Sequence, residues 1–593
     1  MTRLAGVVFA VLVVATGAAF FVTQRLKQSP RLVRTLTVTR AFSPHIPYRQ
    51  ASIRIRLTRA DRATVSVVDP DGDVVRRLAD DQGLRPNQRL GLLWNGRNAR
   101  GRVVPDGEYS VRVGLRRQGR AVVLLDTITV DGTPPHPVVR VRRQGGTNAP
   151  LLYPMRGGGP VRFQVLGTRL PSERLFLYRT DGPRPRLARR LPARRSQAAD
   201  GVWDGRIAGR PAPPAPYVVV ARDTDAVGNA ELSFPFKPAR RGDPEGGAGV
   251  TVRQLAAQGP VAPTASGRRF TVFVDSRGRG YRWRLHRLGQ GRTIARGIRR
   301  GPVLRLLAPR GPSGLYMVTV SRGGYRAVAL VPVQGAGRHR VLVVLPAISW
   351  QGLNRADDDG DGLVDTLARN GRARLDRPLA AGGVPVGFNA NEGPMLRLLD
   401  RPQQRYDITT DAALETGNAA RDLRAHRGVV LVGNPRWLGP ELAEALPAYV
   451  QRGGRVFSPG TGALRRRVSL RDGQLSSPTQ ASTADVFGAN LAPVARRRVE
   501  LLVGADQIGL FRGGDGLFRG FTQFEETLAP GPGARVVARA EEQGARAGAP
   551  VIVATRQGEG LVIRTGLPQW EQRMGELNVL AMTRRAWVLT SLR

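Results

Sequence analysis

The stretch Val341-Leu342-Val343-Val344-Leu345-Pro346 decides the fold of the second half of the chain. A continuous apolar run of this kind is typical of a parallel strand that is covered on both faces. A second run, at residues 428–433 (GVVLVG), is followed by residues 440–452 (PELAEALPAYVQR) and then by residues 455–458 (RVFS). The apolar residues of the middle segment recur with the period of an amphipathic helix, so the order is strand, helix, strand. This order predicts an α/β doubly wound domain over residues 336–593.

The first half of the chain has the pattern of short β-strands. Residues 52–57 (SIRIRL) and 63–68 (ATVSVV) alternate between apolar and polar with period two, as half-buried strands do. A tryptophan-to-tyrosine segment beginning at Trp94 recurs 109 residues later at Trp203, which indicates an internal repeat. We therefore predict four units before the last domain: β-sandwiches at 29–135 and 136–240, a linker at 241–262 and a further small β-domain at 263–335.

The repeated segment carries a family resemblance. Trp94-Asn95-Gly96-Arg97, followed by Gly101 and by residues 105–109 (PDGEY), resembles the Ig-like repeat of the flagellar hook-capping type. The second copy begins with residues 203–206 (WDGR), and Pro216 replaces the glycine that precedes the tyrosine. The resemblance implies two small sandwiches with the tryptophan in the core.

The second half resembles another family. Residues 312–316 (PSGLY), 341–346, 349–354 (SWQGLN) and 406–411 (YDITTD) together resemble the large (beta) subunit of N,N-dimethylformamidase. The resemblance implies a fold related in outline to class I amidotransferases. It also implies hydrolysis of a small amide by a mononuclear iron that tyrosines and a glutamate hold.

The catalytic residues of that family do not carry over. Its relatives show a histidine, acidic residues and a tyrosine after the central strand, where this chain has residues 434–438 (NPRWL). Tyr406 and Glu525 are the candidate catalytic residues that remain, and one tyrosine with one glutamate does not make a metal site. We therefore expect a catalytically degenerate domain without iron. The alternative is a hydrolase of C–N (amide) or glycan bonds acting through that domain.

Residues 357–365 (DDDGDGLVD) form the sharpest motif in the chain. Asp357, Asp359 and Asp361 take positions 1, 3 and 5 of a calcium loop, with a glycine at position 6 for the sharp turn. The carbonyl of Leu363 and the carboxylate of Asp365 complete the predicted ligand set. Clustered carboxylates repel one another unless a cation lies among them, so we expect calcium here rather than a solvated acidic turn. Position 12 is an alanine where an EF-hand has glutamate, which predicts an affinity of about 10⁻⁴ to 10⁻³ M.

The amino terminus predicts a membrane segment. Residues 4–22 (LAGVVFAVLVVATGAAFFV) contain no charge and would span roughly 28 Å as a helix, which is the thickness of a hydrocarbon core. We expect an uncleaved signal anchor (1–28), although residues 16–19 (TGAA) also offer a cleavage site that would make the protein secreted. The flanking basic residues argue for the opposite orientation. The modules that follow nevertheless favour a single-pass protein of the cell membrane with its bulk extracytoplasmic.

Composition limits the remaining possibilities. The absence of cysteine excludes disulfides, thiolate metal sites and a cysteine nucleophile. Basic residues number 92 against 46 acidic ones, but nearly all are arginines spread along the whole chain, which indicates compositional bias. Binding to an envelope polymer or another anionic surface stays open, whereas no motif predicts a specific nucleic acid partner. The prediction is a bacterial, membrane-anchored binding or structural protein of the envelope.

Overall fold

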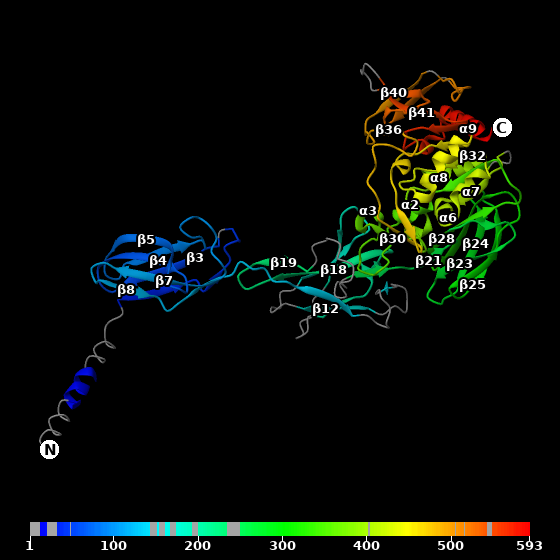
Figure 1. Cartoon of the computed structure of the whole chain (residues 1–593). Helices are drawn as coiled ribbons and strands as arrows, with labels where there is room; N and C mark the ends of the chain where they lie inside the picture. Colours follow the sequence, from blue (N-terminus) through cyan, green and yellow to red (C-terminus); the bar gives the residue numbers. More distant parts are fainter. Residues whose placement is uncertain are drawn as a thin grey trace, which may run out of the picture.

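The computed structural model describes residues 12–20, 32–47, 49–142, 151–152, 160–166, 174–191, 200–233, 249–400, 404–504, 506–514, 516–541 and 548–592. Two β-sandwiches and a larger carboxy-terminal lobe follow one another along the chain (Figure 1). The amino-terminal sandwich and the lobe lie at opposite ends, with the second sandwich between them.

The first sandwich consists of two sheets, antiparallel except for the pair β2–β9, and inner residues alternate along strands such as β3 and β7. One sheet has the order β1-β3-β6, and the other has the order β2-β9-β7-β4-β5 with β8 beside β7. Trp94 is 1% exposed in the core, where its ring packs against Phe42 and Tyr109. The strand bounds are β1 Val33–Val38, β2 Ala41–Phe42, β3 Ala51–Leu57, β4 Asp61–Val68, β5 Val74–Leu84, β6 Arg89–Trp94, β7 Gly107–Leu115, β8 Arg120–Val123 and β9 Ile128–Val130.

The second sandwich repeats this design around Trp203. The Trp203 and Tyr217 ring centroids lie 5.3 Å apart, and the Tyr217 hydroxyl donates to the carbonyl of Pro213, as Tyr109 donates to Pro105. Residues 249–262, which we expected to lie in a linker, contain strands β20 and β21, and β20 pairs with β18 of this sandwich. The bounds are β10 Val138–Arg142, β11 Leu151–Leu152, β12 Val161–Leu166, β13 Arg174–Arg179, β14 Arg186–Leu191, β15 Asp200–Trp203, β16 Arg206–Ile207, β17 Arg210–Pro211, β18 Ala215–Thr224, β19 Ala230–Leu232 and β20 Gly249–Val252.

The small β-domain also has two sheets, with the orders β21-β23-β26 and β22-β28-β27-β24-β25. Its core is formed by residues that alternate along β24, β27 and β28. The opposite face of β28 packs on the last domain. The bounds are β21 Ala256–Gln258, β22 Thr264–Ala265, β23 Arg269–Asp275, β24 Tyr281–Arg287, β25 Thr293–Arg299, β26 Val303–Leu307, β27 Gly314–Arg322 and β28 Tyr325–Gln334.

A nine-stranded sheet forms the last domain, in the order β31-β29-β32-β33-β42-β41-β40-β37-β38. Alternate residues of its central strands face helices α6–α8 on one side and α5 with α9 on the other. The strands of this sheet are β29 Val341–Leu345, β31 Asp407–Thr410, β32 Gly428–Leu431, β33 Arg455–Ser458, β37 Val499–Val503, β38 Leu517–Phe521, β40 Ala534–Glu541, β41 Ala549–Gln557 and β42 Gly560–Arg564. Smaller strands are β30 Arg372–Arg374, β34 Ser469–Arg471, β35 Gln474–Ser476, β36 Asn490–Leu491 and β39 Thr527–Ala529. The helices are α2 Ala347–Gly352, α3 Leu367–Asn370, α4 Ala380–Gly383, α5 Glu392–Leu399, α6 Asp411–Thr416, α7 Ala419–Arg424, α8 Pro440–Gln451 and α9 Leu577–Ser591, with 3₁₀ turns η1 Ala463–Arg465 and η2 Glu571–Arg573.

The prediction of an α/β doubly wound, amidotransferase-like domain was wrong. The structure is mainly β, with 44% strand and 15% helix, and in the nine-stranded sheet the parallel pairs are confined to β31, β29, β32, β33 and β42. Strands β37, β38, β40 and β41 join the same sheet in antiparallel pairs. Antiparallel strands can be joined by short turns and need no crossover helix, so the chain between β33 and β42 forms hairpins where we expected strand–helix units.

The prediction of a transmembrane signal anchor, and with it a single-pass membrane location, was also wrong. Among the described residues, no helix is long and apolar enough to cross a membrane. Residues 12–20 of the predicted segment are helical. The rest of the predicted segment, residues 4–11 and 21–22, lies outside the described residues.

Candidate functional site

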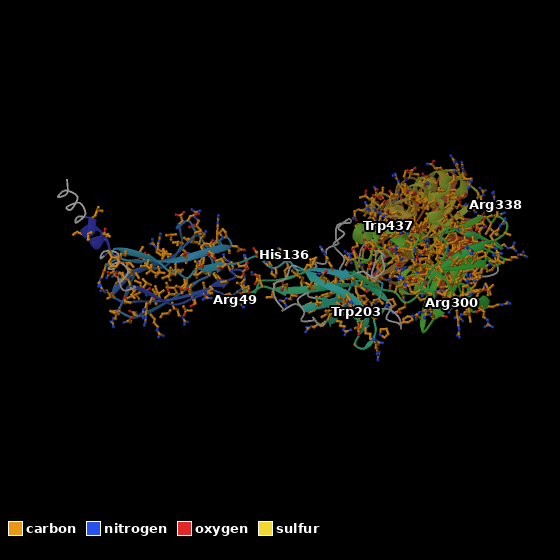
Figure 2. The ribbon with its side chains drawn as sticks, turned by 90° about the horizontal axis from the view of Figure 1, so that it is seen from below. Arg49, His136, Trp203, Arg300, Arg338 and Trp437 are labelled. Carbon is orange, nitrogen blue, oxygen red and sulfur yellow. The ribbon has the colours of Figure 1, made fainter. Side chains whose placement is uncertain are left out.

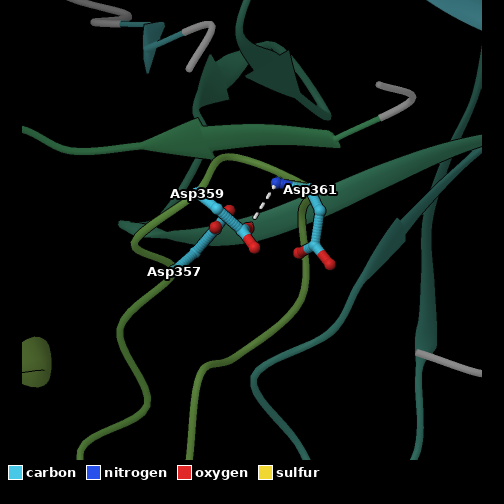
Figure 3. Close-up of side chains that lie close together, drawn as sticks. All are labelled: Asp357, Asp359 and Asp361. Atoms are coloured by element: carbon cyan, nitrogen blue, oxygen red, sulfur yellow. Dashed lines mark hydrogen bonds between the residues drawn. The ribbon is translucent and has the colours of Figure 1, made fainter. Parts of the chain in front are cut away.

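The acidic loop at residues 357–365 lies between α2 and α3. Carboxylate oxygens of Asp357, Asp359 and Asp361 all lie within 4.8 Å of one another. Figure 3 shows these three side chains converging from one turn of the chain. Oxygen ligands at this density are what calcium prefers. Three of the five residues that the sequence analysis singled out thus lie together, and their role as calcium ligands stays a prediction.

Backbone amides shape this turn. The Asp357 carboxylate accepts from the amides of Gly360, at 2.7 Å, and Gly362, at 3.0 Å. The amide of Asp361 donates to Oδ1 of Asp359 at 3.1 Å. Gly362 has φ of 80°, a left-handed conformation that glycine adopts without steric cost.

Two further predicted ligands have other contacts. Oδ2 of Asp365 accepts from the amide of Asp358 at 2.5 Å and so closes the loop. The carboxylate of Asp365 is not part of the three-carboxylate cluster. Leu363 is 3% exposed, and its side chain belongs to the core of the second β-sandwich. The loop is therefore part of a joint between two domains.

Close backbone packing completes this joint. Thr251 Oγ1 of the second sandwich donates to Oδ2 of Asp357, and Thr180 Oγ1 donates to the carbonyl of Gly362. A Cβ atom placed on Gly249 would lie 2.0 Å from the carbonyl carbon of Asp361. Neither the sandwich nor the loop can shift toward the other without a clash.

The electrostatics of the loop favour a cation. Burial raises the pKa of Asp357 well above its usual value. A hydrogen bond from Thr251 opposes this increase, and the negative charges of Asp361 and Asp365 add to it. Burial, and to a smaller extent the negative charge of Asp359, raises the pKa of Asp361 to about 7. Burial is also the largest cause of the raised pKa of Asp365, which is about 6. These carboxylates are therefore costly to ionise in the folded chain unless a positive charge compensates them.

Arg377 braces the loop from the other side, and nothing in its sequence context predicted this role. Its guanidinium is buried and pairs with Oδ2 of Asp358 at 2.7 Å. The same side chain donates to the carbonyls of Asp365, Gln351 and Asn354. Arg377 thus ties the loop to the end of α2 without entering the three-carboxylate cluster.

The two candidate catalytic residues lie far apart. Tyr406 immediately precedes β31 and is therefore at the amino end of a parallel strand. Glu525 does not lie beside Tyr406. The backbone amide of Glu525 donates to the carbonyl of Gly566, beyond the carboxyl end of β42. Strands β31 and β42 are separated by three others, which is roughly 19 Å at the usual strand spacing. The residues are at opposite ends and opposite sides of the parallel strands.

Tyr406 and Glu525 are each buried and held by contacts with other side chains. Tyr406 is 3% exposed beside Arg287 and packs edge-on against Trp587, and burial raises its pKa. Glu525 forms an ion pair with Arg465 at 2.8 Å. A tyrosine in the core and a neutralised glutamate do not fit the iron that the family resemblance implies.

A buried glutamate pair escaped the sequence analysis. Glu392 begins α5, Glu571 begins η2, and they meet at Gly433, just after the carboxyl end of β32. The Gly433 amide donates to Oε1 of Glu571 at 2.8 Å, and a Cβ on Gly433 would lie 2.6 Å from Oε1 of Glu392. Burial raises the pKa of Glu392 to about 7 and that of Glu571 well above its usual value. Two glutamates 179 positions apart give no local signal by which sequence reasoning could pair them.

Histidines that lie far apart in sequence also meet. Asp407 accepts from Nδ1 of His339 at 2.7 Å and from Nε2 of His426 at 3.0 Å. Burial opposes ionisation, but these hydrogen bonds prevail and lower the pKa of Asp407 to about 2. The cluster lies at the amino ends of β29, β31 and β32, and it clamps three strands together.

A small cavity of about 60 Å³ lies beyond the carboxyl ends of β29 and β31. Its walls are largely apolar, and they include Leu330, Leu375 and Trp350. Among the polar groups on its wall, Gln351 and Arg377 bond to each other and the Thr410 hydroxyl accepts from an amide of α6, whereas the buried Nε1 of Trp350 has no hydrogen-bond partner.

Comparison with protein families confirms both resemblances. Residues 306–486 match the N,N-dimethylformamidase beta subunit-like, C-terminal family, and residues 49–119 match the FlgD Ig-like domain family. The first match includes the acidic loop and Tyr406 but ends before Glu525. No curated protein matches the chain.

Solved structures add no further argument. A beta-galactosidase from Bacillus circulans sp. alkalophilus aligns with 42% of this chain and 31% of its own, at 14% identity and a TM-score of 0.26. The exo-beta-1,4-mannosidase Op5Man5 from Opitutaceae bacterium strain TAV5 aligns with 44% of this chain and 37% of its own, at 11% identity and a TM-score of 0.25. The I-band fragment I67–I69 of titin aligns over its whole length with 52% of this chain, at 9% identity and a TM-score of 0.21. The chain thus spans only about a third of the two enzymes.

Proposed function

We propose that this chain is a binding or structural protein in which a calcium ion stiffens the joint between the second β-sandwich and the N,N-dimethylformamidase beta subunit-like domain. The observation that carries the proposal is the position of Leu363. Its side chain lies in the core of the sandwich, while Asp357, Asp359 and Asp361, earlier in the same loop, present their carboxylates to one point. A cation at that point would hold the loop in the shape that inserts Leu363.

The electrostatic cost of the loop supports calcium in particular. A carboxylate cluster with raised pKa values stabilises the fold only when its charge is compensated, and the nearest buried cation, Arg377, pairs with Asp358 outside the cluster. Hard carboxylate and carbonyl oxygens in a flexible turn suit calcium better than magnesium, which demands near-ideal octahedral geometry.

The proposal also holds that the domain has lost the family's catalysis. Tyr406 and Glu525 do not meet, and Glu525 is already paired with Arg465. On the wall of the small cavity near β29 and β31, Gln351, Arg377 and Thr410 bond to the protein. These contacts support a scaffold that presents the domain without turnover.

The joint can be tested directly because the chain has no cysteine of its own. Spin labels at Arg210→Cys and Arg338→Cys, both exposed positions, would report the distance across the joint by electron paramagnetic resonance. We expect a narrow distance distribution in calcium and a broader one after chelation. Labels at Arg120→Cys and Arg210→Cys span the other joint, which has no acidic loop, and serve as the control. Equal widths with and without calcium at the first pair would contradict the proposal.

Hydrolysis is the alternative function, and the buried pair of Glu392 and Glu571 is the observation that favours it. Carboxylic acids with raised pKa values near the carboxyl ends of strands are suited to general acid catalysis. Metal analysis of the full chain, with formate release from N,N-dimethylformamide as the assay, separates the two functions. We expect calcium without iron and no turnover above buffer. Iron together with turnover that Glu571→Gln abolishes would establish the hydrolase instead.

A further inference from the structure

The small β-domain has an unusual charge balance. Residues 253–335 contain 16 arginines and one acidic residue, Asp275, whereas residues 49–130 of the first sandwich contain 16 arginines and nine acidic residues. The two segments are nearly equal in length and identical in arginine content. A bias toward arginine along the whole chain therefore does not explain the missing acids of the small β-domain.

Four of these arginines share one face of its five-stranded sheet, which we call the arginine face. Arg282 and Arg284 lie on β24, Arg296 on β25 and Arg326 on β28, and all four are exposed. Arg284 is directly opposite Arg296. Arg282 and Arg326 both pair with Ser321 of β27, from its two sides. The residues that alternate with them, including Tyr281 and Leu285, point into the core.

The arginine face lacks compensating charge. Among the ion pairs of the described residues, none involves Arg282, Arg284, Arg296 or Arg326, and the lone Asp275 pairs with Arg253 and Arg277. Like charges directly opposite each other on a sheet are destabilising. Burial, then the charges of Arg326 and Arg284, lower the pKa of His286 on the same face. The positive potential is thus felt by a neighbouring side chain.

Part of this sheet face is covered and part is open. Val328 and Leu330 of β28 pack against the last domain, whereas β25 is the edge strand of the sheet. Figure 1 shows β24 and β25 at the outside of the carboxy-terminal lobe, far from the first sandwich. Arg300, which follows β25, is labelled at the edge of the lobe in Figure 2. The arginine face is therefore open to a large partner.

We propose that the arginine face binds a linear polymer of phosphate groups that carries no bases. Guanidinium groups bind phosphate in bidentate fashion. Same-face residues along a strand are about 6.7 Å apart, and directly opposite residues are about 5 Å apart, so Arg282, Arg284 and Arg296 form a compact group that consecutive phosphates can bridge. Arg326 lies two strands from Arg282, on the far side of Ser321. Recognition of single-stranded nucleic acid would need aromatic side chains for base stacking. The residues paired with the arginines are instead Thr319, Ser321 and Ile298, and the half-buried His286 is next along β24 on the same face.

Binding of fluorescent inorganic polyphosphate to the full chain tests this proposal. The combined substitution Arg282→Gln, Arg284→Gln and Arg296→Gln should weaken binding at least about tenfold at low salt. It should also flatten the slope of log K against log salt by about 2, because each lost phosphate contact removes about 0.7. The matched control is Arg54→Gln, Arg89→Gln and Arg120→Gln in the first sandwich, where the residues are equally exposed. The control should change binding by less than about twofold.

The same variants distinguish the alternatives. Equal losses in the two triple variants would mean that the chain binds polyphosphate through overall charge, and the proposal would be wrong. Tighter face-dependent binding of oligo(dT) than of polyphosphate would assign the face to nucleic acid. Equally tight binding of hyaluronate would show that carboxylates suffice, and either result would overturn the proposal. Circular dichroism and melting temperatures of both variants verify that they fold, and calcium should have no effect on the difference.

Discussion

The substitution Asp359→Asn separates the charge of the acidic loop from its shape. Asp359 is exposed, and its Oδ1 accepts from the amide of Asp361 at 3.1 Å. A carboxamide oxygen can accept the same hydrogen bond, so the turn should persist. The negative charge of Asp359 is the second cause, after burial, of the raised pKa of Asp361, and it also raises that of Asp365. Removing it should relieve repulsion and remove a calcium ligand at the same time.

The sign of the pH effect follows from these shifts. The folded-state pKa values of Asp361 and Asp365, about 7 and about 6, lie above the ordinary value of 3.8. Between pH 3.8 and these values the folded chain binds more protons than the unfolded chain, so stability falls as the pH rises through this window. The shift of Asp365 alone corresponds to about 3 kcal/mol, which is lost by neutral pH.

Calcium should restore much of this loss. At a dissociation constant of about 10⁻⁴ M, 10 mM calcium adds about 2.7 kcal/mol to the free energy of unfolding. The parent chain should therefore gain about 1–3 kcal/mol from calcium at pH 7.5, measured by urea unfolding with tryptophan fluorescence. The Asp359→Asn variant should gain less than about 0.5 kcal/mol. In chelator at pH 7.5 it should be more stable than the parent, and this advantage should vanish at pH 4.

The control for this experiment is Asp376→Asn. Asp376 is an exposed acid that pairs with Arg374 outside the loop, so its loss should change neither the calcium response nor the pH dependence. A full calcium response in Asp359→Asn would refute the assigned ligand set. Lower stability of that variant in chelator at pH 7.5 would refute the electrostatic reasoning.

Three further substitutions address the joint, the repeat and the glutamate pair. Leu363→Ala should lower the free energy of unfolding by about 3 kcal/mol and separate the sandwich transition from that of the lobe in calorimetry; a single unshifted transition would count against the joint. Tyr217→Phe removes the hydrogen bond to Pro213 and should cost about 1 kcal/mol in urea unfolding, whereas no loss would make that bond dispensable. Burial raises the pKa of Glu571 above its ordinary 4.5, so the parent should lose thermal stability as the pH rises from 4.5 through neutral. Glu571→Gln keeps an acceptor for the Gly433 amide and should flatten that decline, and an unchanged melting-temperature profile would contradict the buried charge.

The sandwich repeat was predictable because its determinants are local. Trp94 and Trp203 each precede a glycine turn, and each meets a tyrosine that follows within 15 positions. Both tryptophans are almost fully buried against that tyrosine. Residue type and spacing across one connection between the two sheets therefore suffice to indicate the core.

The mixed sheet was not predictable in the same way. Residues 341–346 and 428–433 read as parallel strands, and they pair in parallel. A short apolar run does not specify whether its other neighbour is parallel or antiparallel, because both kinds of strand can be covered on two faces. Strands β40 and β41 join through their own hairpin, and they make the sheet a mixed one.

Clusters of ionisable residues that come from distant segments could not be predicted from the sequence. Glu392 and Glu571 meet only because α5 and η2 both begin beside Gly433. His339 and His426 meet because each precedes a strand that neighbours the other in the sheet. Strand order, which the sequence does not state, decides both encounters.

The acidic loop could be predicted from the sequence only in part, because its internal geometry is local and its burial is not. Its internal geometry follows from short-range rules: alternate aspartates and a glycine with positive φ place Asp357, Asp359 and Asp361 around one point whatever surrounds them. The burial of the loop does not follow from such local rules. Thr251 contacts the loop, and Leu363 enters the core of the second sandwich, only after the two domains dock. Docking is also what raises the pKa values, since burial is their largest cause. A calcium loop on an isolated domain would therefore be an exposed turn with ordinary acids, whereas here any ion bound to it necessarily acts on the joint.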